Sequence, residues 1–123
     1  MVAVVDWELA TIGHPLADLA YACMAYRLPP DDPVFAGLAG VDLAALDIPN
    51  EEELVTIYCK AAGRAEIPNW PFYMAFSHFR LASITQGVYA RSLQGNASDL
   101  KAKLYGSVAK TSASIGWSIA AAA

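Results

Sequence analysis

A single β-strand pattern stands at the start of a chain that otherwise shows helical patterns. Residues 2–7, VAVVDW, are rich in β-branched and apolar side chains, which is typical of a short buried strand. A strand needs partners for its backbone N–H and C=O groups, and no second segment shows a convincing strand pattern. We therefore expect a mainly α fold with one short N-terminal strand or hairpin, paired with residues outside the chain or with a second copy.

Helical spacing and helix-end signals recur along the rest of the chain. Pro15 suits the first turn of a helix, whereas Asn50 suits an N-cap ahead of three glutamates, and Gly63 suits a helix end. About four helices are predicted, over residues 15–27, 50–63, 71–93 and 97–119. The segment 28–49 is rich in proline and glycine and is predicted to be irregular, with one helical turn near Leu43.

Apolar residues at helical spacing predict which face of each helix is buried. In the second helix these residues are Leu54, Ile57, Tyr58 and Ala61, and in the last they are Leu100, Leu104, Val108, Thr111 and Ile115. Phe72, Phe76 and Phe79 recur along the third helix. Aromatic residues at this spacing usually belong to a core, although Trp70, Tyr73 and Phe76 could also line a pocket for an acceptor substrate.

The composition is unusually apolar. Hydrophobic residues make up 56% of the chain and charged residues 16%, compared with about 25% charged in an average domain. We expect either an apolar surface covered by a partner or a chain that is part of something larger. A net charge of −4 argues against nucleic-acid binding, which needs a basic surface. No apolar run reaches the ~18 residues of a membrane span.

Cysteine usage and the N-terminus indicate a cytoplasmic protein. Cys23 and Cys59 lie in apolar helical patterns, and the first residues lack the basic and apolar regions of a signal peptide. We therefore expect reduced, buried thiols rather than a disulfide. The two histidines and two cysteines do not show the spacing of a zinc site.

Two acids at the end of the strand pattern are the first candidates for chemistry. Asp6 ends an apolar strand, where an unpaired carboxylate is costly to bury. Such an acid could hold Mg²⁺ beside phosphate oxygens, or it could pair with an arginine or face water. Glu8 lies on the same face of a continuing strand and could join the metal ligands, although a solvated or capping role is the simpler interpretation.

Four further side chains are weighed between structural and functional roles. His14 lies in a turn and His78 in an aromatic helix, and we interpret both as structural. Arg80 and Arg91 share one helix face and could meet a substrate phosphate or carboxylate. The favoured alternative is that these arginines pair with Asp18 or with the acids at 51–53.

The stretch VVDWELATIGHPLADLAY closely resembles the segment after the catalytic loop of aminoglycoside phosphotransferases and choline-kinase-like enzymes. A second stretch, FYMAFSHFRLASITQGVYARSLQGNA, is similar to late helices of the branch found fused to acyl-CoA dehydrogenases. The resemblance implies the helical C-terminal lobe of a protein-kinase-like fold, spanning residues 1–123. It implies that Asp6 binds Mg²⁺ bridging the phosphates of ATP, and that Asp18 braces the catalytic loop. Arg80, Arg91 and Tyr73 would then lie on the acceptor side, together with part of segment 28–49.

Several parts that this family requires do not occur in the sequence. The chain contains no His-Gly-Asp catalytic loop, no glycine-rich phosphate loop and no candidate ATP lysine ahead of Asp6. We therefore expect a phosphotransferase fragment that is inactive on its own and binds neither Mg²⁺ nor ATP well. The intact enzyme would transfer the γ-phosphoryl group of ATP to a hydroxyl of a small molecule.

Exposed apolar surface left by the missing parts predicts a homodimer. The rival hypothesis is a stand-alone, non-catalytic helical module that forms homo-oligomers and only binds. A methionine directly before the strand pattern favours this rival.

Overall fold

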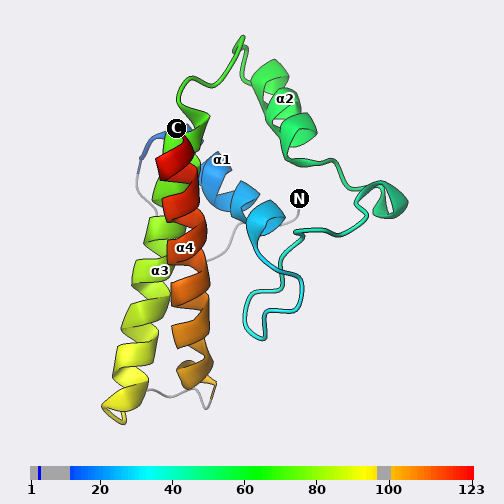
Figure 1. Cartoon of the computed structure of the whole chain (residues 1–123). Helices are drawn as coiled ribbons and strands as arrows, with labels where there is room; N and C mark the ends of the chain where they lie inside the picture. The colour runs from blue at the N-terminus through cyan, green and yellow to red at the C-terminus, as the bar shows by residue number, and fades with distance from the viewer. Residues whose placement is uncertain (1–2, 4–11, 97–100) are drawn as a thin grey trace.

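The computed structural model describes residue 3, residues 12–96 and residues 101–123. Four α-helices follow in order: α1 (Pro15–Cys23), α2 (Glu51–Ala61), α3 (Trp70–Leu93) and α4 (Tyr105–Ala122) (Figure 1). Single 3-10 turns cover Met24–Arg27, Ala44–Leu46 and Ala102–Leu104. The described residues therefore confirm the mainly α prediction, and the strand predicted over 2–7 lies outside them apart from Ala3.

The predicted helix over 15–27 forms as α1 followed by a tighter turn. Pro15 occupies the first turn of α1, where its missing N–H costs no hydrogen bond. The 3-10 turn then continues the chain to Arg27, and Leu28 leaves it in an extended conformation. One continuous apolar face results, with Leu16, Ala20 and Cys23 buried on α1 and Met24 buried on the turn.

Helices α3 and α4 form an antiparallel hairpin that is the longest feature of the molecule (Figure 1). Small residues on α4 allow close packing: a Cβ added at Gly116 would lie 3.0 Å from the Cβ of His78 on α3. The buried face of α4 consists of Val108, Ala109, Ser112 and Gly116. The predicted stripe was therefore wrong in part, because Leu104 is 42% exposed and the helix buries its small side chains instead.

Helix α1 packs across this hairpin and completes the core. One buried cluster joins Met24 and Leu28 to Leu81 of α3 and Val108 of α4. A second joins Ala20 and Cys23 of α1 to Met74 of α3. Cys23 and Cys59 are buried free thiols, as predicted.

Helix α2 stands apart from the hairpin in Figure 1, although its start is sharply defined. The Asn50 side chain accepts a hydrogen bond from the backbone N–H of Glu53, whose carboxylate accepts one from the N–H of Asn50. This capping box confirms the predicted helix start. The predicted buried face was wrong in part: Ile57 is 54% exposed, and Cys59 is the residue that α2 buries.

The irregular segment between α1 and α2 is held by backbone hydrogen bonds. The N–H of Gly37 donates to the carbonyl of Pro29, and that of Ala39 to the carbonyl of Leu28. Only glycine fits at position 37, since an added Cβ would lie 2.0 Å from the carbonyl oxygen of Leu28. The predicted helical turn forms at Ala44–Leu46.

Candidate functional site

The segment that carries Asp6 and Glu8 lies outside the described residues, so the structure leaves both metal-ligand predictions open. Asp18, the acid predicted to brace a catalytic loop, lies in the first turn of α1. Its side chain is exposed and makes no hydrogen bond or ion pair with any residue that the structure describes. The carboxylate is therefore free to meet a group supplied from elsewhere.

An aromatic stack holds the turn before α1 against α3. The carbonyl of His14 accepts the first helical hydrogen bond of α1, from the N–H of Ala17 at 2.9 Å. The imidazole of His14 stacks on the ring of Tyr73, with centroids 5.3 Å apart and planes 19° apart. Tyr73 itself packs against the cluster formed by Ala20, Cys23 and Met74. His14, at the start of α1, is thus anchored to α3.

The two arginines of α3 do not make the ion pairs that the sequence favoured. The guanidinium of Arg80 lies over the ring of Tyr21, 5.1 Å from its centroid. Arg91 lies on the same helix face about 16 Å along the axis and is exposed. Within the described parts of the chain, neither arginine pairs with Asp18 or with Glu51. An acceptor-side role for Arg80, Arg91 and Tyr73 stays a prediction.

A polar network that no local sequence pattern indicates connects the 3-10 turn after α1 with the starts of α2 and α3. The Arg27 guanidinium donates two hydrogen bonds to the Glu51 carboxylate, from Nε at 2.9 Å and from its NH2 group at 2.8 Å. The indole Nε1 of Trp70 donates to the same carboxylate at 3.0 Å. Nearby, the Tyr26 hydroxyl donates to the carbonyl of Pro49 at 2.7 Å. These bonds hold the start of α2 against the helical body.

The charges in this network stabilise one another. Burial by itself would raise the pKa of Glu51, but the hydrogen bonds from Arg27 and Trp70 outweigh burial and lower it. The hydrogen bond to Glu51 raises the pKa of Arg27 further above its ordinary value. Both groups are therefore ionised at neutral pH, and Arg27 offers little free positive charge to a ligand.

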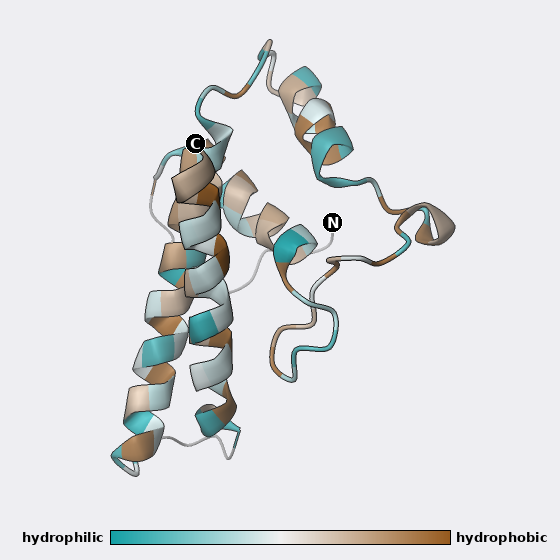
Figure 2. Ribbon diagram, viewed as in Figure 1, coloured by the Kyte–Doolittle hydropathy of each residue, from teal (hydrophilic) through white to brown (hydrophobic). Residues whose placement is uncertain are grey.

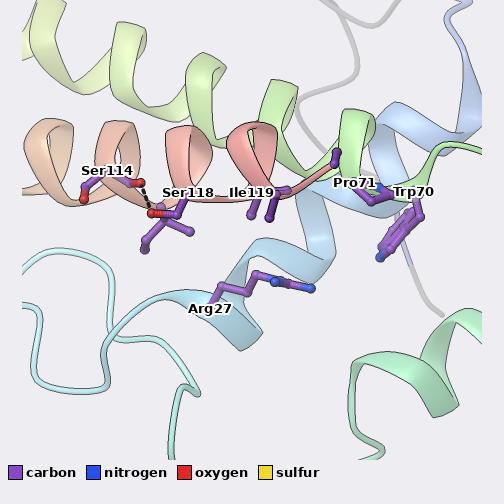
Figure 3. Close-up of a pocket in the computed structure, with 9 residues that line it drawn as sticks. Arg27, Trp70, Pro71, Ser114, Ser118 and Ile119 are labelled. Atoms are coloured by element: carbon purple, nitrogen blue, oxygen red, sulfur yellow. Dashed lines mark hydrogen bonds between the residues drawn. The ribbon is translucent and has the colours of Figure 1, made fainter.

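A pocket of about 540 Å³ opens beside this network, between the start of α3 and the end of α4 (Figure 3). Arg27 and Trp70 form one side, and Ser114, Ser118 and Ile119 of α4 form the other. The Ser118 hydroxyl donates to the carbonyl of Ser114 at 3.0 Å, so it is engaged by its own helix. The walls of the pocket are mostly apolar, and their polar side chains are Arg27, Trp70, Ser114 and Ser118.

Two buried side chains, Cys23 and His78, are poorly placed for chemistry. Burial, reinforced by Glu51, raises the pKa of the Cys23 thiol to about 11, which disfavours the thiolate. His78 is fully buried, as expected for a structural histidine. Across residues 12–96 and 101–123, no three histidine, cysteine or acidic side chains lie close enough to hold a metal ion. In the same ranges no helix has the length and apolarity needed to cross a membrane.

Comparison with known proteins gives a family match over the first part of the chain. A sequence model of the phosphotransferase enzyme family matches residues 1–73, which include Asp6, Asp18, α1 and α2. This match bears out the phosphotransferase resemblance seen in the sequence.

Relatives among curated proteins cover nearly the whole chain. Acyl-CoA dehydrogenase family member 10 of Mus musculus is 48% identical over 98% of the chain, and family member 11 of Homo sapiens is 42% identical over 94%. Probable acyl-CoA dehydrogenase IBR3 of Arabidopsis thaliana is 41% identical over 80%. The chain spans only 11%, 15% and 12% of the lengths of these three proteins, respectively. No solved structure matches the chain.

Proposed function

The chain belongs to the phosphotransferase enzyme family, and on that premise we propose that it is the C-terminal helical part of an ATP-dependent phosphotransferase. The reaction is transfer of the γ-phosphoryl group of ATP to a hydroxyl group of a small molecule. The observation that carries this proposal is the family match over residues 1–73, because it contains both acids to which the resemblance gives roles.

Asp6 is the proposed Mg²⁺ ligand. The described residues do not form a metal site by themselves, so the cation depends on Asp6 and on groups beyond this chain. When bound, Mg²⁺ neutralises charge on the phosphates of ATP. The proposed contribution of the helical body is positional, since the His14–Tyr73 stack holds the chain against α3 eight residues after Asp6.

Asp18 has the proposed role of bracing the catalytic loop of the complete enzyme. Its exposed carboxylate has no partner among the described residues, which leaves it able to accept hydrogen bonds from another backbone segment. The chain by itself is proposed to be inactive. Phosphoryl transfer requires several positioned charges acting together, and the sequence contains neither the His-Gly-Asp loop nor a glycine-rich phosphate loop.

The acceptor is proposed to be a hydroxyacyl thioester or a related metabolite rather than an antibiotic. This choice is supported by the names of the relatives, which are acyl-CoA dehydrogenase family members. A pocket lined by Arg27, Trp70 and α4 could contribute to the acceptor side, because it combines apolar walls with polar groups.

The metal role can be tested on the chain itself with Mn²⁺, a paramagnetic substitute for Mg²⁺. In a ¹H–¹⁵N NMR spectrum, millimolar Mn²⁺ should broaden the signals of residues around Asp6, because the affinity of a single carboxylate is weak. Asp6→Asn should abolish this broadening, whereas the matched variant Asp18→Asn should preserve it. Broadening that is centred elsewhere, or that survives in Asp6→Asn, would overturn the assignment.

A further inference from the structure

An apolar groove runs along one face of the α3–α4 hairpin. Its rim consists of Phe72, Phe76 and Phe79 on α3 and Trp117 on α4, and its floor consists of alanines and Gly116. The groove has a volume of about 370 Å³ and continues along the two helices into a second hollow of about 360 Å³. Figure 2 shows that strongly apolar residues recur along the length of both helices.

The groove faces away from the core. The α3 residues that pack toward α1 are on another face and include Met74 and Leu81. Helix α1 contributes no residue to the lining of either hollow. The hairpin therefore has two apolar faces. Helix α1 covers one of them, and no described residue covers the other.

The exposed aromatic area, if fully buried, approaches the smallest area that a specific interface requires. Phe72 is 63% exposed, Phe76 41%, Phe79 64% and Trp117 75%. At ~200 Å² per aromatic side chain, these fractions amount to about 500 Å² on one chain. Two such faces in contact would bury about 1,000 Å² from the rings alone, which reaches the lower bound for a biological interface.

The shape and charge of the groove fit a second copy of the same surface. In a two-fold dimer each surface meets itself, so a charged patch would repel its counterpart. None of the described residues lining the hollow of about 370 Å³ is charged, and Lys110 is the one charged residue that lines the second hollow. The three phenylalanines form a row on α3 beside a floor of alanine and glycine, and in the two-fold arrangement this row of one copy would lie over the floor of the other.

We infer that this groove is a homodimer interface, in which the α3–α4 hairpins of two copies pack together as a four-helix bundle. Two antiparallel hairpins with apolar faces are the ordinary components of such a bundle. Phe79 lies at the centre, because it lines both hollows. The inference rests on the hairpin alone and is independent of the proposed phosphotransferase role.

Sedimentation equilibrium of the 123-residue chain tests the inference. The wild-type chain should have twice the 13.1 kDa mass of one copy. Phe79→Glu should raise the dissociation constant at least about thirty-fold, since it places a charge at the centre of the interface. Ile84→Glu is the matched control: Ile84 is a 53% exposed apolar residue of α3 that lies on a different face, and this variant should remain dimeric.

Circular dichroism of each variant confirms that the helices are intact, which is expected because both substituted side chains are more than half exposed in the single chain. A wild-type chain that stays monomeric at high micromolar concentration would overturn the inference, and the groove would then belong to a different polypeptide or to an apolar ligand. A dimer that Ile84→Glu disrupts and Phe79→Glu does not would also overturn it, as would polydisperse aggregation without a defined dimer.

Discussion

Acid should destabilise this fold through one buried histidine. His78 is 0% exposed, and neither imidazole nitrogen has a hydrogen-bond partner among the described residues. Burial lowers the pKa of His78 to about 4; the positive charge of Arg27 acts in the same direction, and Glu51 opposes it. The folded chain therefore contains neutral His78 at every pH above about 4.

The magnitude follows from the difference between the folded and unfolded chains. In the unfolded chain a histidine has a pKa near 6.5, so acid protonates the unfolded state first and shifts the equilibrium toward it. This stabilising contribution is complete above about pH 6.5 and is lost progressively as the pH falls toward 4. The free energy of unfolding should fall by roughly 2–3 kcal/mol between pH 7.5 and 4.5 from this group alone.

Urea unfolding followed by circular dichroism at a series of pH values measures this loss. Protein concentration must be the same throughout, because association adds to the apparent stability. His78→Leu should flatten the pH dependence, whereas His14→Gln, a change at an exposed histidine, should leave it in place. The reasoning is refuted if wild-type stability is constant over this range or if His78→Leu loses as much as the wild type.

Two further substitutions test the attachment of α2 and the path of the segment before it. Glu51→Gln removes the charge that pairs with Arg27 and should cost about 1 kcal/mol and increase hydrogen exchange in α2, whereas the neighbouring Glu52→Gln should change neither. Equal effects of both substitutions would argue against the network. Gly37→Ala forces a Cβ into backbone and should cost at least about 3 kcal/mol in urea unfolding, whereas Gly13→Ala, which no described residue crowds, should be nearly neutral. A stable Gly37→Ala variant would show that this segment takes another path.

Local signals in the sequence predicted α1, α2 and α3 well, whereas the last helix was predicted from residue 97 and begins only at Tyr105, after a 3-10 turn at Ala102–Leu104. Pro15, Asn50 and Gly63 act through backbone geometry within a few residues, so their effects can be predicted without knowledge of the tertiary structure. The faces of the helices were harder to predict. Phe72, Phe76 and Phe79 have the spacing of a core stripe but are 41–64% exposed, because α3 is apolar on two faces and packs only one of them within this chain.

Contacts between residues far apart in the sequence explain why the polar network of the candidate site could not be predicted. Arg27 and Glu51 are 24 residues apart, and Glu51 and Trp70 are 19 apart, so no local pattern connects them. A weak signal did exist, since an arginine ends one predicted helix and a glutamate begins the next. Helix α4 buries Ser112 and Gly116, whereas Leu104, just before the helix, is exposed. This choice also depends on α3, which approaches α4 closely only where side chains are small.

The reading frame upstream of the Met1 codon tests the central claim most directly, that this chain is the helical part of a phosphotransferase. The account predicts an in-frame sequence that encodes a His-Gly-Asp loop, an asparagine some five residues later and an earlier lysine-bearing lobe. An in-frame stop codon and a ribosome-binding site immediately before Met1 would contradict it and would favour a stand-alone helical binding module.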